Sequence, residues 1–207
     1  PMNPSHLSLH PHAKDLGGGF VVRRLLPAAQ RQAVGPFLFF DHFGPVTARP
    51  GDDHDVRPHP HIGLATVTYL FEGAMMHRDS LGSVQEILPG AINWMTAGRG
   101  IVHSEMFPLL HTDAPNPCEL FQIWLNLPAA SKMAAPHFTM FWGQDIPALQ
   151  AGGVEVSVVA GALNGAPAPL APPPESWAAQ PDADVAIWTL KLAPGARFTL
   201  PVAQGQG

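Results

Sequence analysis

Residues 84–95 read Val84-Gln85-Glu86-Ile87-Leu88-Pro89-Gly90-Ala91-Ile92-Asn93-Trp94-Met95, which is two short apolar runs around a Pro-Gly pair. Pro89 presets φ for the first central position of a type II turn, and Gly90 accepts the positive φ of the second. The β-branched and aromatic residues in both runs are typical of strands. The stretch therefore predicts a β-hairpin.

The same pattern of short apolar runs between turn residues extends along most of the chain. The 207 residues include 20 Gly and 24 Pro, which favours many short strands over a helical bundle. Weak helical signals occur at 147–150 and 175–179, and the proline-rich segment 167–174 predicts an extended surface loop. We therefore predict an all-β fold, a barrel or a sandwich, whose further strands lie at residues 20–26, 36–40, 66–71, 119–127, 137–142, 154–160 and 185–192.

Composition excludes several classes of protein. The 11 Lys and Arg residues against 16 Asp and Glu residues give a net charge of −5, with no basic run, so direct binding to nucleic acid or to an anionic membrane is not expected. A single cysteine, Cys118, excludes an intramolecular disulfide framework and is interpreted as a small buried hydrophobe. No signal peptide and no membrane-spanning run is recognised, and we expect a cytoplasmic protein.

Two short motifs carry the chemistry. His59-Pro60-His61 places two imidazoles at i and i+2, which face the same side of an extended segment. His103-Ser104-Glu105 repeats that spacing with an imidazole and a carboxylate. If the two segments become neighbouring strands, three nitrogens and one oxygen converge on one point. This donor set suits a divalent transition metal, and an octahedral ion would keep two positions open for a chelating substrate and O2.

Each motif also has a purely structural interpretation. A histidine pair on a strand is often an ordinary hydrogen-bonded pair, and Pro58 and Pro60 restrict their segment to an edge, a bulge or a strand entrance. His10-Pro11-His12 repeats the tripeptide but lies before the first predicted strand, in a stretch typical of a frayed terminus, so no metal is expected there. Six further histidines are interpreted as ordinary hydrogen-bonding residues without a partner at i+2, and of these only His54 is kept as a residue of a pocket mouth: His6, His42, His54, His77, His111 and His137.

Four blocks of the sequence closely resemble the signature of the pirin family. They stand in the family's order at residues 36–45, 55–73, 76–82 and 93–105. The resemblance implies a cupin β-barrel, normally two in tandem, with one metal ion in the N-terminal barrel. It also implies His59, His61, His103 and Glu105 as the ligands, which are the residues that the spacing selects. Because pirins usually carry a complete second barrel, we expect an N-terminal metal-binding cupin barrel at 1–130 and a partial or reduced cupin-like domain at 131–207.

The resemblance further implies quercetin 2,3-dioxygenase activity, usually with iron. We therefore expect a metal-dependent dioxygenase that opens a flavonol with O2 and releases CO, with Fe(II) as the metal and Glu105 as the catalytic base. Ni, Cu, Co, Mn and Zn stay open, because neutral histidines also accept these metals. Candidates for an apolar wall around the substrate, with core packing as the alternative, are Phe37, Phe39, Trp94, Met95 and Met106.

Two other functions remain open at this point. One is a regulatory or interaction protein with a structural or redox-sensing metal and a protein partner. The other is a cupin without a metal. Unpaired strand edges in the C-terminal part would need cover from the first barrel or from a second subunit, so an oligomer is also left open.

Overall fold

The computed structural model describes residues 7–17, 20–52 and 54–201, and almost all of its regular structure is β. A seven-stranded antiparallel sheet has the order β1-β2-β3-β10-β5-β8-β11. Its strands are β1 (His12–Asp15), β2 (Val21–Leu26), β3 (Phe37–Ala48), β10 (Asn116–Asn126), β5 (Leu64–Glu72), β8 (Ile92–Thr96) and β11 (His137–Phe141).

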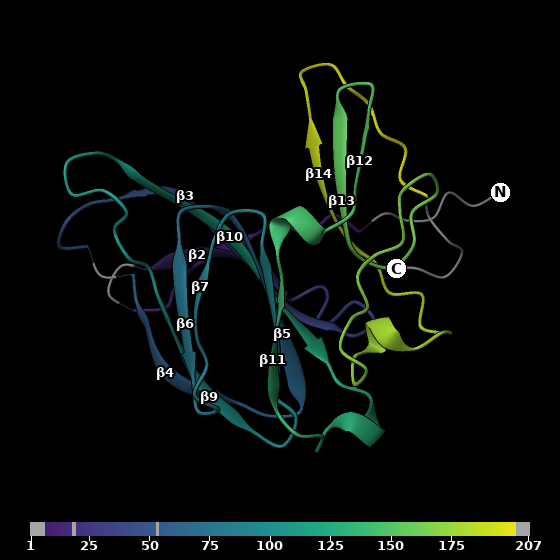
Figure 1. Cartoon of the computed structure of the whole chain (residues 1–207), viewed down its shortest axis with the longest axis horizontal. Helices are drawn as coiled ribbons and strands as arrows, with labels where there is room; N and C mark the ends of the chain where they lie inside the picture. The colour runs from purple at the N-terminus through teal and green to yellow at the C-terminus, as the bar shows by residue number, and fades with distance from the viewer. Residues whose placement is uncertain (1–6, 18–19, 53, 202–207) are drawn as a thin grey trace.

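A four-stranded sheet, β4-β9-β6-β7, faces the larger sheet and closes the barrel with it (Figure 1). A third sheet, β12-β13-β14, stands at the other end of the molecule. The four-stranded sheet contains β4 (Val56–His61), β9 (Ile101–Met106), β6 (Met75–Asp79) and β7 (Val84–Ile87). The third sheet contains β12 (Ala148–Ala151), β13 (Val154–Ala160) and β14 (Ile187–Leu192), and three short 3₁₀ turns are η1 (Ala129–Ser131), η2 (Gly143–Asp145) and η3 (Trp177–Ala179).

The Pro89-Gly90 turn forms, but the predicted hairpin around it is wrong. Gly90 has φ of +82°, and the Ala91 amide donates to the Leu88 carbonyl at 3.0 Å, as the turn requires. However, β7 pairs with β6, whereas β8 pairs with β5 and β11. The turn therefore connects a strand of the four-stranded sheet to a strand of the seven-stranded sheet. The two strands that flank it do not pair with each other.

Three other expectations also need correction. Residues 147–150 are not helical, because β12 pairs along its whole length with β13. The segment around His12 is not frayed, because β1 pairs with β2 from His12 to Asp15. Of the predicted helical segment 175–179, only the 3₁₀ turn η3 forms. The proline-rich segment 167–174 contains no helix or strand, as predicted.

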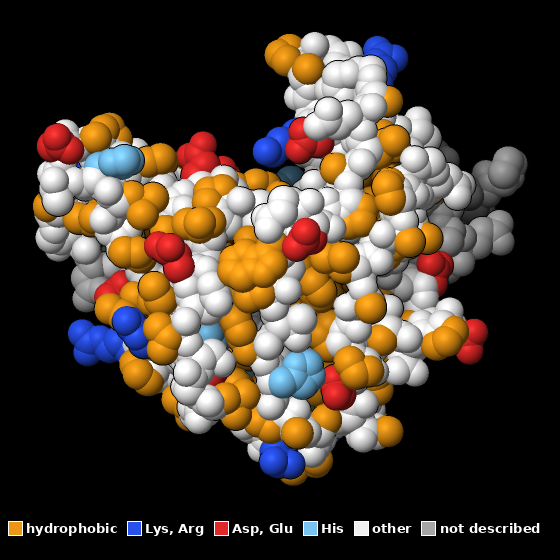
Figure 2. Space-filling model, viewed as in Figure 1, with side chains coloured by type: hydrophobic (Ala, Val, Ile, Leu, Met, Phe, Trp, Pro, Cys, Tyr) orange, Lys and Arg blue, Asp and Glu red, His pale blue; other side chains and the backbone are white. Residues whose placement is uncertain are grey.

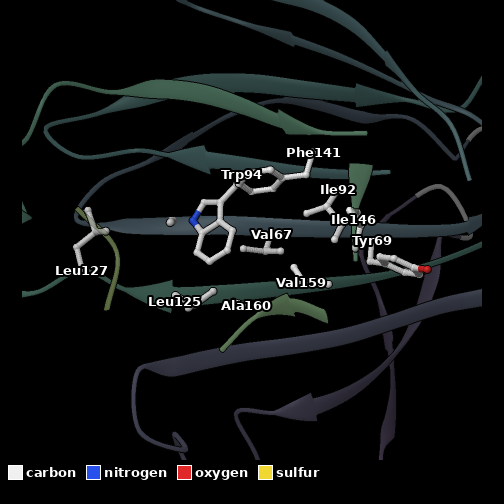
Figure 3. Close-up of a cluster of buried hydrophobic side chains, with 11 residues drawn as sticks. Val67, Tyr69, Ile92, Trp94, Leu125, Leu127, Phe141, Ile146, Val159 and Ala160 are labelled. Atoms are coloured by element: carbon white, nitrogen blue, oxygen red, sulfur yellow. The ribbon is translucent and has the colours of Figure 1, made fainter. Parts of the chain in front are cut away.

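One apolar cluster packs on the inner face of the seven-stranded sheet, and another packs on its outer face. The inner cluster fills the barrel and includes Phe20, Phe43 and Leu70. The outer cluster surrounds Trp94 and joins the sheet to residues of β13, including Val159 (Figure 3). Residues of β13 therefore cover the outer face of this sheet, and β11, which lies beyond residue 130, joins the sheet directly. The domain division at residue 130 stays a prediction.

Two observations concern the surface charge and the length of the helices. On the described part of the face shown in Figure 2, Lys and Arg side chains form no continuous basic patch. None of the helices in the described ranges has the length and apolar character needed to span a membrane.

Candidate metal centre

The tripeptide His59-Pro60-His61 forms the end of β4, an edge strand of the four-stranded sheet. Proline removes a ladder donor, so an edge position with a register shift accommodates both prolines of this segment. Such a shift lies between Val56 and His59 in the pairing of β4 with β9. The pairing sets His59 directly opposite His103, so the predicted neighbouring strands form.

Three histidines come together at this point. One nitrogen from each of His59, His61 and His103 lies within 4.8 Å of the others. Nε2 of His61 lies 3.1 Å from Nε2 of His103, and the ring centroids are 4.4 to 5.0 Å apart. Nδ1 of His59 lies 2.9 Å from the carbonyl oxygen of Arg57, so a proton on Nδ1 leaves Nε2 free as a ligand.

The electrostatics of the cluster favour neutral imidazoles. Burial, followed by the nearby charge of His59, lowers the pKa of His61 to about 4. Burial, followed by the neighbouring histidines, lowers the pKa of His103 to about 2. Both side chains are therefore neutral at pH 7, which is the form that coordinates a metal ion.

Glu105 lines a cavity that His59 and His61 also line. Its carboxylate oxygens are not among the ligand atoms that lie within 4.8 Å of one another. Its side chain is buried, and its Oε1 has no hydrogen-bond partner among the described residues. Burial raises the pKa of this carboxyl to about 7. A buried oxygen without a partner is costly unless a ligand, an ion or a water satisfies it. Three converging imidazoles beside this orphaned carboxylate fit a divalent transition metal.

The cavity at the cluster has a volume of about 90 Å³. Phe39 and Trp124 form part of its wall: their rings stack 4.0 Å apart, and Trp124 meets the His61 ring edge to face at 4.9 Å. Phe20, Phe43 and Phe107 also line it, and the sequence prediction missed them because they belong to none of the chemical motifs.

Of the five predicted wall residues, only Phe39 lines this cavity. Phe37 lies on the other side of the seven-stranded sheet, and Trp94 packs there beside Phe141 and Val67 (Figure 3). In a regular strand Phe37 and Phe39 would share a face, because they are two residues apart. The pairing of β10 with β3 shifts register between Trp124–Phe39 and Leu125–Phe37, which puts the two rings on opposite faces of the sheet. Two methionines are also elsewhere: Met95 lies in a small core cluster, and Met106 is exposed and accepts a hydrogen bond from Arg78.

His77 and Asp79 form a buried pair that the sequence prediction missed. His77 was interpreted as lacking a partner at i+2, but Nε2 of His77 lies 2.9 Å from a carboxylate oxygen of Asp79, and both side chains are fully buried. Asp79 stands opposite His103 in the pairing of β6 with β9, and His77 stands opposite Glu105. The spacing His77-Arg78-Asp79 is that of His103-Ser104-Glu105, so the signal was present.

The remaining histidines lie outside the cluster. His10 and His12 are exposed, and His6 falls outside the described residues. His54 does not line the cavity but packs against the rings of Phe20 and Phe43, which do. His42 pairs with Glu119 and His137 with Glu175, as expected of ordinary hydrogen-bonding residues. Cys118 is buried, as predicted.

The barrel and its histidines agree with comparisons to known proteins. The family model described as Pirin matches residues 19–125. This chain belongs to the pirin family. The match spans both barrel sheets from β2 to β10 and includes all four predicted ligand positions. The cupin β-barrel that the resemblance implied is thereby confirmed.

Individual relatives of this pirin-family chain support the same assignment. A pirin-like protein of Caulobacter vibrioides is 47% identical over 156 residues, which are 74% of this chain and 54% of the relative. Human pirin is 34% identical over 200 residues, which are 96% of this chain and 62% of human pirin. The chain thus spans about half to two thirds of the length of these relatives.

A solved structure, that of quercetin 2,3-dioxygenase from Acinetobacter baumannii, superposes with a TM-score of 0.70 at 40% identity. The superposition covers 78% of this chain and 52% of the neighbour. The fold of this chain is therefore shared, over the superposed part, with a protein described as a quercetin 2,3-dioxygenase.

Proposed function

We propose that this pirin-family chain carries a metal-dependent dioxygenase site that opens a flavonol such as quercetin with O2 and releases CO. The observation that carries the proposal is the convergence of three histidine nitrogens within 4.8 Å beside the partnerless Glu105 carboxylate, in an aromatic cavity. The name of the Acinetobacter neighbour supports the choice of substrate.

In this proposal, His59, His61, His103 and Glu105 hold one divalent metal ion, with Fe(II) as the native metal. A bound Fe(II) would supply Lewis-acid polarisation of the flavonol hydroxyl and bring O2 beside the activated carbon. The three neutral imidazoles fix the site, because they bind without first losing a proton. Glu105 accepts the hydroxyl proton at its carboxylate when the substrate enters.

The space at the site limits how the substrate can enter. The inner cavity, about 90 Å³, is small beside the roughly 300 to 1,000 Å³ of common ligand pockets. A recess of about 440 Å³ adjoins it and shares Phe20, Val56 and His59 as lining residues. We place the reacting ring of the flavonol in the inner cavity and its outer ring in the recess.

A turnover experiment tests this function. The purified chain is loaded with Fe(II) without oxygen, mixed with quercetin and exposed to air. We expect the visible absorbance of the flavonol to fall as CO appears in the headspace. Quercetin that persists over a protein with a full complement of iron would contradict the proposal.

The second function is a metal-binding regulatory or interaction protein. The small volume of the inner cavity favours it, because a protein that never admits a flavonol needs no larger space. Full iron occupancy without turnover, together with an intact fold, is the outcome that this second function predicts.

A further inference from the structure

A row of polar side chains crosses the inner face of the seven-stranded sheet. Gln122 on β10 stands opposite Asp41 of β3 on one side and Thr68 of β5 on the other. Thr68 in turn stands opposite Asn93 of β8. Four adjacent strands therefore each place a polar residue at the same level of the barrel, between apolar residues such as Leu70 and Leu120.

This row is unusual because it lies within a core. Asp41, Thr68 and Asn93 are only 3%, 0% and 2% exposed. Burying a polar group without a partner is costly, and the members differ in the number of hydrogen bonds that they make. Oδ1 of Asn93 has no partner among the described residues. Asp41 makes two hydrogen bonds, because Nε and Nη2 of Arg24 donate to its two carboxylate oxygens at 2.8 and 2.7 Å.

Only one end of the Gln122 side-chain amide has a hydrogen-bond partner in the described part of the chain. Its Oε1 accepts a hydrogen bond from the Thr68 hydroxyl at 2.6 Å, which holds this end of the side chain against β5. Among the described residues, its Nε2 donates no hydrogen bond to a protein acceptor. Gln122 lines the same cavity as His59, His61 and Glu105. The amide therefore offers N–H donors to whatever enters the candidate metal centre.

Two unmatched groups thus face one cavity, a donor on Gln122 and an acceptor on Glu105. The carboxylate Oε1 of Glu105 has no donor among the described residues. A ligand that satisfies both presents a donor to Glu105 and an acceptor to Gln122, and a hydroxyl beside a carbonyl oxygen supplies this pair. Neighbouring hydroxyl and carbonyl groups form the metal-chelating pair of a hydroxy-ketone.

We propose that Gln122 is a specificity-determining residue that donates a hydrogen bond from Nε2 to the carbonyl oxygen of a hydroxy-ketone ligand. Thr68 is a positioning residue, since it acts only by holding the Gln122 amide. The proposal deepens the proposed function and rests on it, because a flavonol presents this hydroxy-ketone at its reacting ring.

The test measures binding without turnover. Maltol, a single-ring compound with the same hydroxyl and carbonyl pair, is titrated without oxygen into the Fe(II)-loaded chain and into Gln122→Leu, and the dissociation constants are compared. Loss of one ligand hydrogen bond should weaken maltol binding about 3- to 10-fold and leave iron affinity unchanged. Gln150→Leu, the same change at an exposed position of β12, is the matched control and should bind maltol like the parent.

Thr68→Val tests the positioning role. We expect a smaller loss of maltol affinity than in Gln122→Leu, and no additional loss in the double variant, because Thr68 acts through Gln122. Gln122→Met, which also keeps an unbranched side chain, repeats the test should Gln122→Leu fold poorly. An additional loss in the double variant would overturn the role of Thr68.

Three results would overturn the proposal for Gln122. They are unchanged maltol binding in Gln122→Leu with iron in place, loss of iron in both Gln122 variants, and no maltol binding to the iron-loaded parent. A parallel titration with 3-hydroxyflavone separates the two proposals. If maltol binding depends on Gln122 but 3-hydroxyflavone does not bind, the flavonol function fails while the hydroxy-ketone specificity stands.

Discussion

The tripeptide His-Pro-His occurs at residues 10–12 and again at residues 59–61, and the two copies have different surroundings. The first copy ends where the edge strand β1 begins, and the second copy forms the end of the edge strand β4. His10 and His12 are exposed, whereas His61 is only 7% exposed and belongs to the three-histidine cluster. The difference therefore lies outside the tripeptide.

The neighbouring strand explains the contrast. His12 stands opposite Arg24 of β2, a residue whose guanidinium already binds Asp41. His59 stands opposite His103 of β9, which supplies a third imidazole. A cation opposite the first pair opposes a metal ion, and an imidazole opposite the second pair binds one. A short motif thus acquires chemistry only from the strand beside it.

The largest effect is expected from removing either imidazole of the second copy. His59→Ala and His61→Ala should each lose most of the bound metal, because one of three clustered nitrogens disappears. The double change His10→Ala/His12→Ala should retain it. Metal content by elemental analysis after gel filtration checks both, and equal loss in the two sets would show that the contrast between the copies is wrong.

Glu105→Gln is expected to separate metal binding from proton transfer. Three imidazoles remain, so most of the metal should stay bound. Turnover of quercetin should fall about 10²- to 10⁴-fold, since proton transfer by a placed base is typically worth that factor. Steady-state rates on variants with matched iron content provide the measurement. Turnover within a few-fold of the parent would limit Glu105 to a ligand role.

Asp79→Ala should lower the free energy of unfolding of the barrel, where Asp79 lies in the same four-stranded sheet as the second His-Pro-His. The change leaves Nε2 of His77 and the amides of Leu81 and Ser83 without their acceptor, and each buried group left unsatisfied costs about 1–3 kcal/mol. The same substitution at Asp15, an exposed residue of β1, is the matched control and should cost under about 1 kcal/mol. Urea denaturation at pH 7 measures both, and similar midpoints for the two variants would refute the structural role of the His77 pair.

The smallest effect is expected at the native cysteine. Burial, followed by the charges of Glu119 and Glu72, raises the pKa of Cys118 to about 12. Since only the thiolate reacts, the folded chain should show almost no alkylation at pH 8, and its rate should rise with pH. A cysteine placed by His12→Cys on the exposed strand should react at once. Rapid labelling of Cys118 in the folded chain would contradict its burial.

Local signals in the sequence were sufficient for many features of the barrel. Alternating apolar residues located most strands, because a half-buried strand needs that pattern wherever it pairs. The two motifs with i, i+2 spacing identified the three clustered histidines, because extended backbone sets both side chains on one face. The prolines of residues 58 and 60 correctly restricted β4 to a sheet edge, since proline lacks a ladder donor.

Other features depended on partners that are distant in the sequence. The Pro89-Gly90 turn is local, yet the sheet that each flanking strand joins is decided by hydrogen bonds to β6 and β5. Gln122 carries no motif, and it faces the cavity only because β10 lies between β3 and β5. Sequence by itself determined which residues share a face wherever a strand pairs without a register shift. Only the tertiary structure decided which face meets the histidines, because strand pairing is a long-range choice.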